Sequence, residues 1–420
     1  MSDLWPAPTL TDAIDARVLL PASKSLTNRL LVLAALAGSP SVLRQPLAAR
    51  DTELMADALV ALGATIVQGA EEWHVTPGQP ATGQLTIDCG LAGTVMRFVP
   101  PLAGLSEAAV TFDGDPRARK RPMATTIASL RGLGMEVDGE DALPFTVRGH
   151  GRVRACELSI DASASSQFVS ALLLAAPRFE HGLTLHHVGR PLPSQPHLDM
   201  TVAELRHRGV TVDDSIRGTW RVEHGPISGF DVTVEPDLSN AGAFIAAALV
   251  TGGTVQIADW PDRTTQAGDA WRVIAGEFGG KATHADGGLS FTGSPEVAGV
   301  DLDLHDVGEL TPVVAAVAAL AAGPSRLRGI AHLRGHETDR LKALATELNK
   351  LGGDVEETDD GLVIRPRPLH GGTFATYDDH RMAHAAAVIG LAVPGIQVEN
   401  VATTAKTYPG FVVDWEQFVS

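Results

Sequence analysis

Basic residues gathered in short runs are the side chains of this sequence best suited to chemistry. The chain carries 33 Lys and Arg against 50 Asp and Glu, a net charge of −17, so as a whole it repels nucleic acid and anionic membranes. Local cation clusters on such a chain instead suit small phosphates and carboxylates. The basic residues concerned are Lys24 and Arg29, the run Arg117 to Arg121, and the single residues Arg97, Arg340, Arg381 and Lys406. The sequence therefore predicts small anionic ligands, and neither nucleic acid nor a membrane as a partner.

Three segments place polar residues where a helix is expected to begin. Ser23-Lys24-Ser25 offers a charge and hydroxyls to a phosphate but lacks the glycines of a Walker A loop, and a plain serine N-cap is its alternative. Gly93-Thr94 lets backbone approach a ligand closely, although a structural turn would use the same residues. Ser163 to Gln167 is rich in donors without the Gly-x-Ser-x-Gly elbow of a hydrolase. This last segment predicts ligand binding rather than covalent catalysis.

His336-Glu337-Thr338-Asp339-Arg340 puts an acid, a candidate base and a cation in what we expect to be one helical turn. A capping box with surface ion pairs is the alternative. The pairs His332/His336 and His380/His384 have a spacing of four, but the sequence contains no His-Glu-x-x-His and no Cys near either pair. We therefore predict no metal. A strand followed by Gly-x-Gly-x-x-Gly is also absent from the sequence, so we predict no dinucleotide cofactor.

Two cysteines, Cys89 and Cys156, are too few for a disulfide framework and favour a reducing compartment. The N-terminus does not resemble a signal peptide. The longest apolar stretch, Val313 to Ala322, is far shorter than the roughly 18 residues of a membrane span. We therefore expect a soluble, cytoplasmic protein.

Six segments rich in Ala and Leu recur along the chain, and each opens with polar residues. When one polar marker is taken from the start of each segment, the intervals are 68, 70, 73, 69 and 72 residues. The markers are Arg29, Arg97, Gln167, Asn240, Glu309 and Arg381. Helices that are apolar on nearly every face belong in an interior. Each segment thus predicts a buried helix whose N-terminal end presents N–H groups that attract anions.

A second, amphipathic pattern follows five of the buried segments. It shows apolar residues at three- and four-residue spacing, then a Gly suited to a left-handed cap, then β-branched residues suited to a strand. These segments begin at Leu59, Ile127, Val202, Val273 and Leu344. Regular spacing alone leaves an α/β solenoid or a doubly wound sheet open, but the sequence lacks long parallel-strand runs. Six units in 420 residues predict two domains of three units each.

Together and in this order, the motifs resemble the 5-enolpyruvylshikimate-3-phosphate synthase (3-phosphoshikimate 1-carboxyvinyltransferase) family from Ser23 to Pro409. The resemblance implies an α/β fold of two similar domains, each with three βαβαββ units and buried parallel helices, an inside-out α/β barrel. It places one domain at residues 1–19 with 236–420 and the other at 20–235, with the active site in the cleft between them. It further implies a monomer that uses no cofactor and is inhibited by glyphosate.

The activity that the resemblance implies is transfer of the enolpyruvyl group of phosphoenolpyruvate to the 5-hydroxyl of shikimate 3-phosphate, in the biosynthesis of aromatic amino acids. Phosphate leaves from a non-covalent tetrahedral intermediate. Glu337 matches a proton-handling glutamate, and Glu309 stands where the family usually has an aspartate that takes a proton from the 5-hydroxyl. Lys24 joins these two residues in catalysis.

The resemblance also assigns binding residues. Shikimate 3-phosphate is expected at Lys24, Ser25, Arg29, Ser165, Ser166 and Ser194. Phosphoenolpyruvate is expected at Lys24, Gly93, Arg121, Gln167, Arg340, Arg381 and Lys406. Arg97, His332 and His336 complete the set of expected substrate contacts, together with Glu309.

Four positions depart from the family pattern. Ala22 replaces a usual Gly, Leu91 a usual Asn, His336 a usual Lys, and Glu309 the usual Asp. Of these, His336 affects the contact with the shikimate phosphate, and Glu309 affects the base. Two alternatives remain: the related UDP-N-acetylglucosamine 1-carboxyvinyltransferase, and a catalytically inactive binding relative. The first usually carries a reactive Cys in the loop that is Asp115 to Pro122 here, where this chain has none.

Overall fold

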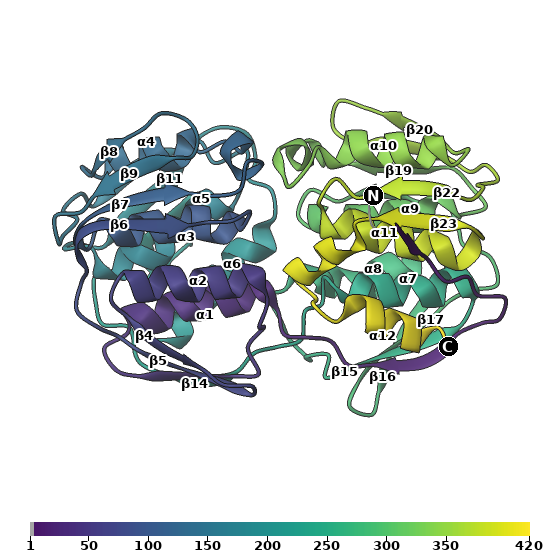
Figure 1. The fold of residues 1–420 in the computed structure, drawn as a ribbon, viewed down its shortest axis with the longest axis horizontal. Helices are drawn as coiled ribbons and strands as arrows, with labels where there is room; N and C mark the ends of the chain where they lie inside the picture. Colours follow the sequence, from purple (N-terminus) through teal and green to yellow (C-terminus); the bar gives the residue numbers. More distant parts are fainter. Residues whose placement is uncertain (1–3) are drawn as a thin grey trace. The chain divides into compact units, whose positions relative to one another are not determined.

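The chain divides into two compact units in a computed structural model that describes residues 4–420 (Figure 1). One unit is Ala22–Val234; the other joins the N-terminal segment up to Pro21 to Glu235–Ser420. Each has its own hydrophobic core. The boundary between the two compact units lies at 21/22 and at 234/235. The predicted domain boundaries at 19/20 and 235/236 stay a prediction.

Three buried helices that pack against one another form the core of the unit Ala22–Val234. They are α1 (Lys24–Leu36), α3 (Gly93–Ala103) and α5 (Gln167–Ala175). All residues of α3 are buried, as expected for a helix that is apolar on every side. The amphipathic helices of this unit are α2 (Arg50–Ala61), α4 (Ala124–Gly132) and α6 (Gln195–His207).

Three four-stranded sheets belong to this unit. The first has the order β14-β3-β5-β4, with strands Asp231–Thr233, Ser41–Arg44, Glu72–Thr76 and Thr65–Gln68. The second has the order β6-β7-β9-β8, with strands Thr82–Asp88, Glu107–Asp113, Phe145–Arg148 and Glu136–Asp138. The third has the order β10-β11-β13-β12, with strands Glu157–Ile160, Leu183–His187, Thr219–Val222 and Val212–Asp213.

The other unit repeats this plan. Its buried helices are α7 (Ala241–Thr251), α9 (Thr311–Ala319) and α11 (His380–Ala392), and its further helices are α8 (Trp271–Glu277), α10 (Arg340–Lys350) and α12 (Phe411–Phe418). One sheet, β16-β17-β15-β2, has strands Lys281–Ala285, Gly288–Thr292, Thr254–Ala258 and Asp15–Val18. The second, β18-β19-β21-β20, has strands Asp301–Asp303, Ser325–Arg328, Leu362–Arg365 and Asp354–Glu357. The third, β1-β23-β22, has strands Leu4–Pro6, Ile396–Glu399 and Gly372–Ala375.

The predicted βαβαββ unit is confirmed in the order β6-α3-β7-α4-β8-β9. Its first two strands run parallel, and the last two add antiparallel. In two sheets, however, the first strand comes from a distant part of the chain. Strand β14 pairs parallel with β3, and β2 pairs parallel with β15. In each unit, one sheet is thus completed by a strand that the spacing of local sequence patterns does not predict.

The five glycines expected to end the amphipathic helices all adopt the left-handed conformation that a side chain disfavours. They are Gly63, Gly134, Gly209, Gly279 and Gly352, with φ values of 113°, 82°, 82°, 92° and 95°. A strand follows each of them, as predicted. Within residues 4–420, no helix combines the length and apolar character needed to cross a membrane.

Candidate active site

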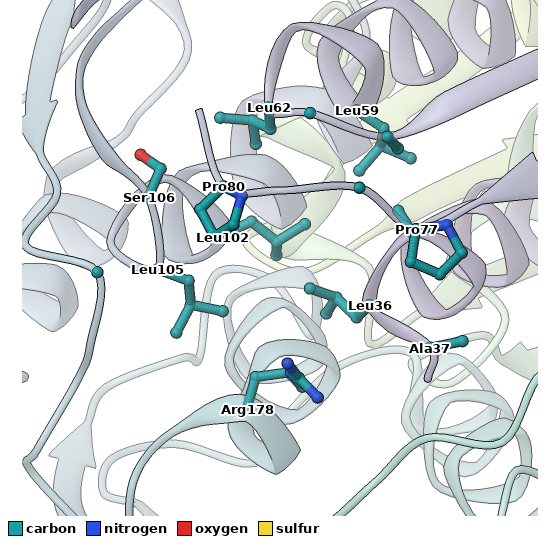
Figure 2. Close-up of a pocket in the computed structure, with 15 residues that line it drawn as sticks. Leu36, Ala37, Leu59, Leu62, Pro77, Pro80, Leu102, Leu105, Ser106 and Arg178 are labelled. Carbon is teal, nitrogen blue, oxygen red and sulfur yellow. The ribbon is translucent and has the colours of Figure 1, made fainter. Parts of the chain in front are cut away.

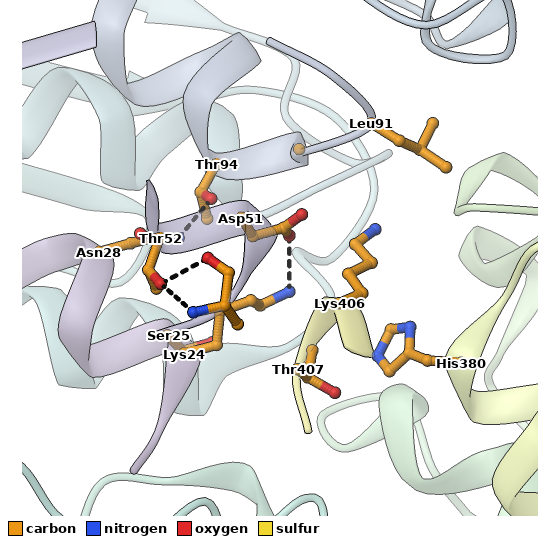
Figure 3. Close-up of polar contacts among 12 residues, drawn as sticks. Lys24, Ser25, Asn28, Asp51, Thr52, Leu91, Thr94, His380, Lys406 and Thr407 are labelled. Carbon is orange, nitrogen blue, oxygen red and sulfur yellow. Dashed lines mark hydrogen bonds and ion pairs between the residues drawn. The ribbon is translucent and has the colours of Figure 1, made fainter. Parts of the chain in front are cut away.

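The N-terminal end of α1 carries the first predicted site residues (Figure 3). Ser23 caps the helix, with its hydroxyl accepting from the Leu26 N–H. Lys24 Nζ lies 3.4 Å from Asp51 Oδ2, and the two side chains are 19% and 3% exposed. This separation is long for an ion pair. The ammonium is therefore held in place by a buried carboxylate while part of it still faces solvent.

Arg29 is almost completely buried. Its guanidinium donates to Thr201 Oγ1 at 2.8 Å and to the carbonyls of Ser25 and His197, both at 3.0 Å. It also lies over the ring of Phe98. These contacts tie α1 to α6 and α3, so Arg29 has a structural role in addition to the substrate contact, which stays a prediction.

Two arginines converge on the first residue of α3. A Cβ on Gly93 would lie 3.0 Å from Nη1 of both Arg97 and Arg121. Arg97 donates to the Gly93 carbonyl at 3.2 Å, and Arg121 to the Leu91 carbonyl at 3.4 Å. Both side chains are buried, and among residues 4–420 the Arg121 Nε has no hydrogen-bond partner. Two buried cations beside the positive end of a helix are an arrangement suited to an anion.

The basic run Arg117 to Arg121 does not act as one cluster. Arg121 turns inward at the end of the short helix η1 (Ala118–Lys120). Arg119 instead pairs with Asp113 on the surface, with Nε–Oδ1 and Nη2–Oδ2 distances of 2.9 and 2.7 Å. Sequence proximity alone does not distinguish the inward residue from the surface one.

Polar groups of α5 and α6 lie near the same helix ends. Ser165 Oγ accepts from the Gln167 N–H at 3.3 Å. Gln167 Oε1 is buried without a hydrogen-bond partner among the described residues. Arg97 lies over the ring of Phe168, which brings the starts of α3 and α5 together. Ser166 is buried at the N-cap of α5, and the half-buried Ser194 precedes α6 with a left-handed φ of 59°.

The other unit holds a compact cluster of charges around Arg340, the first residue of α10. Arg340 Nε and Nη2 donate to Asp379 at 2.8 and 3.1 Å, and Nη2 also reaches Glu337 Oε2 at 3.2 Å. Lys406 Nζ lies 2.7 Å from Glu337 Oε1. The prediction that His336 to Arg340 share one helical turn is wrong. The helix begins only at Arg340, because Asp339 caps it by accepting from the Lys342 N–H.

Three carboxylates determine the charge state of Arg340. Burial disfavours the charged guanidinium, but the fields of Asp379, Glu337 and Glu309 outweigh it and raise the Arg340 pKa. Glu309 lies in the short helix η4 (Gly308–Leu310) and accepts a hydrogen bond from the Ser239 hydroxyl. Both predicted catalytic carboxylates therefore share the field of one permanently charged arginine.

Three histidine rings lie near one another, and the one shared by both pairs, His332, lies next to the segment that carries Glu309. The ring centres of His305 and His332 are 6.0 Å apart, and those of His332 and His336 are 5.8 Å apart. Burial, together with His305 and Arg340, lowers the pKa of His332 to about 4. His332 is therefore neutral at physiological pH. Its Nε2 would lie 2.6 Å from a Cβ on Gly308, the neighbour of Glu309.

The N-terminal end of α11 holds Arg381, which is 7% exposed. Asp379 caps this helix, with Oδ1 accepting from the Arg381 N–H at 2.9 Å. Asp379 is not among the site residues predicted from the sequence, although an Asp before an Ala-rich helix indicates a cap. Asp51, the partner of Lys24, is not among them either, because no local pattern links the two.

A cavity of about 220 Å³ in the unit Ala22–Val234 lies at the opposite ends of the helices from the predicted site residues (Figure 2). Its lining includes Leu36, the last residue of α1, and Leu62, which directly follows α2. Leu102 and Leu105, at and just after the end of α3, also line it. The helices of this unit therefore run parallel, as predicted. Their C-terminal carbonyls disfavour anions, so the predicted substrates do not suit this cavity.

The described residues contain no group of three or more His, Cys, Asp or Glu side chains arranged to hold a metal ion. The expected absence of a metal and of a cofactor stays a prediction. Both sets of residues place fixed positive charge near helix N-terminal ends. The set around Arg340 also contains carboxylates that are hydrogen-bonded to cations. Such an arrangement can bind phosphates and carboxylates and can transfer protons.

Known proteins match this chain along nearly its whole length. A sequence model described as EPSP synthase (3-phosphoshikimate 1-carboxyvinyltransferase) matches residues 8–415. A 3-phosphoshikimate 1-carboxyvinyltransferase from Kocuria rhizophila is 56% identical over 430 residues, which cover 99% of this chain and 97% of the relative.

Solved structures show the same fold. An EPSP synthase from Acinetobacter baumannii aligns with a TM-score of 0.79 at 23% identity, over 98% of this chain and 97% of that chain. The enolpyruvyl transferase NikO from Streptomyces tendae aligns with a TM-score of 0.77 at 17% identity, over 99% and 97%. At these identities the structural likeness concerns the fold alone.

Proposed function

The chain belongs to the EPSP synthase (3-phosphoshikimate 1-carboxyvinyltransferase) family, and we propose how its residues carry out the family's reaction. It is thus a transferase of the shikimate pathway. The substrates are phosphoenolpyruvate and shikimate 3-phosphate, and the reaction moves the enolpyruvyl group to the 5-hydroxyl and releases phosphate. The observation that carries the assignment of roles is the 2.7 Å contact between Lys406 and Glu337, beside the buried Arg340.

Binding uses the fixed cations. Arg121 and Gln167, at the starts of the buried helices, hold the phosphate of phosphoenolpyruvate, while Arg340 and Arg381 hold its carboxylate. Lys24 contacts both substrates, and Ser165, Ser166 and Ser194 donate to shikimate 3-phosphate. The support is geometric: Arg97 and Arg121 meet over Gly93, and a guanidinium pairs with planar anions through two parallel bonds. The placement of all these residues around one cleft stays a prediction.

Proton transfer uses the carboxylates. The Glu337–Lys406 pair gives a proton to the methylene carbon of phosphoenolpyruvate, and the 5-hydroxyl oxygen then bonds to the carbon that bears the phosphate. Glu309 takes the hydroxyl proton, which completes the tetrahedral intermediate. The carbon–oxygen bond to phosphate then breaks with its electron pair leaving on the phosphate, while the former methylene carbon returns its proton to the Glu337–Lys406 pair, so the enolpyruvyl double bond forms again. General acid and base groups of this kind contribute about 10²–10⁴-fold.

A phosphate-release assay with two acceptors tests this function. The enzyme is mixed with phosphoenolpyruvate and either shikimate 3-phosphate or UDP-N-acetylglucosamine, and the product is identified by mass. We expect release only with shikimate 3-phosphate. Release with UDP-N-acetylglucosamine would favour the related transferase, and binding without release would favour an inactive relative. Cys89 is buried, and burial raises the pKa of its thiol, so it does not replace the loop cysteine that the related transferase usually has.

The chain acts on small molecules as a monomer in the cytoplasm, without nucleic acid or a membrane as a partner, and glyphosate competes with phosphoenolpyruvate. The net charge of −17 supports the exclusion of nucleic acid. Sedimentation of the purified protein tests the monomer, which a concentration-dependent rise in mass would contradict.

A further inference from the structure

A turn of unfavourable backbone conformation precedes the Asp379–Arg340 pair. Between β22 and α11, Tyr377 and Asp378 have φ values of 55° and 57°. The Asp379 N–H donates to the Thr376 carbonyl at 3.0 Å and closes a four-residue turn. Turns with two consecutive left-handed residues are dominated by Gly, Asn and Asp, and a bulky aromatic residue rarely adopts this conformation. Contacts outside the turn must therefore hold Tyr377 in place.

Glu347, two turns along α10 from Arg340, supplies those contacts. Glu347 is 2% exposed, and its carboxylate accepts from the Tyr377 hydroxyl at 2.8 Å, from the Ala375 N–H at 2.9 Å and from Lys350 Nζ at 2.9 Å. Helix α10 thus contacts this segment at two places. Glu347 binds Ala375 and Tyr377, and Arg340 binds Asp379, which follows the turn. The hydrogen bond from Tyr377 is charge-assisted, because its acceptor is a buried carboxylate, and such bonds are stronger than neutral ones.

A third contact links the turn to the segment that carries Lys406. Strands β22 and β23 are parallel, with Ala375 opposite Glu399, so the residues that follow them meet at one edge of the sheet. There Asn400 Nδ2 donates to Asp378 Oδ1 at 2.8 Å. Asn400 itself has a φ of 51° and immediately precedes η6 (Val401–Lys406). The same turn therefore fixes the start of α11 and the start of η6.

We propose that Glu347 and Tyr377 are positioning residues for the phosphoenolpyruvate half of the site. They hold the Tyr377–Asp378 turn so that Asp379 orients Arg340 and Asn400 orients the segment ending in Lys406. Neither residue touches the reacting atoms. The assignment of Arg340 and Lys406 to phosphoenolpyruvate rests on the proposed function.

Tyr377→Phe removes one hydroxyl and leaves the ring, so it tests the proposal directly. We expect the KM for phosphoenolpyruvate to rise about five- to thirtyfold, a part of the roughly 10- to 150-fold that a hydrogen bond to a charged group contributes, while the KM for shikimate 3-phosphate changes less than about twofold. Hydrogen exchange should also become faster at the amides of residues 376–381 and 400–406. Glu347→Gln, which loses one of two acceptor oxygens, should give the same pattern.

Asn349→Ala is the matched control, because Asn349 makes two hydrogen bonds from the same helix to Val355, at 2.8 and 2.7 Å, away from the turn. It should lower the melting temperature and leave both KM values unchanged. Unchanged KM values and unchanged exchange in Tyr377→Phe would overturn the proposal, as would equal rises of both KM values. If the wild-type enzyme releases no phosphate with shikimate 3-phosphate, the proposed function fails instead, and the exchange measurement still tests the positioning role.

Discussion

Arg340 and Asp379 form an ion pair that is almost fully removed from water. The guanidinium makes two hydrogen bonds to the carboxylate, at 2.8 and 3.1 Å, and the side chains are 3% and 0% exposed. Burying two charges is costly unless each compensates the other. This pair therefore holds the central cation of the cluster in place. Loss of either partner would leave a buried charge without compensation.

Asp379→Ala should lower the free energy of unfolding by about 3–5 kcal/mol, because it removes the closest counter-charge of a buried arginine. Urea unfolding followed by circular dichroism measures this. Asp231→Ala is the control, since Asp231 pairs with Arg44 at 2.7 Å on the surface, with side-chain exposures of 52% and 48%. It should cost less than about 1 kcal/mol. Equal losses in the two variants would contradict the importance assigned to burial.

Gly93→Ala should weaken glyphosate more than phosphoenolpyruvate. The new methyl group would lie 3.0 Å from Nη1 of both Arg97 and Arg121, so the guanidiniums must shift and the longer inhibitor loses more room than the substrate. We expect a KM increase of several-fold and an inhibition constant that rises at least about tenfold further. Gly276→Ala is the control, because a Cβ there meets no atom within 4 Å. Equal losses for inhibitor and substrate would reject the steric argument.

Lys24→Met should reduce kcat by about 10²-fold or more, because the proposed function makes Lys24 a preorganised cation that contacts both substrates. It should also destabilise the fold modestly, by about 1–3 kcal/mol, since Asp51 is 3% exposed and loses a cation 3.4 Å away. Steady-state turnover and thermal melting measure the two effects. The double variant with Asp51→Asn should regain stability without regaining turnover. Near-normal turnover in Lys24→Met would remove this residue from the site.

His332 should make stability depend on pH. Its pKa falls from 6.5 in the unfolded chain to about 4 in the folded protein, so below pH 6.5 the unfolded state binds a proton that the folded state does not. Stability is therefore complete above pH 6.5 and is lost as pH falls toward 4. Between pH 7 and 5, wild type should lose roughly 1–2 kcal/mol more than His332→Gln.

Urea titrations at the two pH values measure this difference, to which the buried His384 contributes equally in both proteins. His150→Gln is the control, since His150 is 56% exposed and should leave the loss as in wild type. A His332→Gln protein whose stability falls with pH as steeply as wild type would contradict the neutral state of His332.

Local signals in the sequence are enough to predict the repeated architecture. Apolar periodicity, polar helix starts and the five terminal glycines are local signals, because each follows from one element's own burial or backbone conformation. That is why the spacing of the markers from Arg29 to Arg381 predicted the buried helices, and why Ser23 and Asp339 are found as helix caps. The family resemblance supplied the residue roles, which local patterns do not contain.

Which polar groups contact one another follows only from the folded chain. Asp379 lies 39 residues from Arg340 and Asp51 lies 27 residues from Lys24, so neither pair follows from local spacing. The run Arg117 to Arg121 gives no sign that Arg121 turns inward while Arg119 pairs with Asp113. Strands β2 and β14 pair with strands that are distant in the sequence, so local patterns do not predict these pairings either. Contacts between distant segments depend on packing across the whole unit, and no single element carries that information.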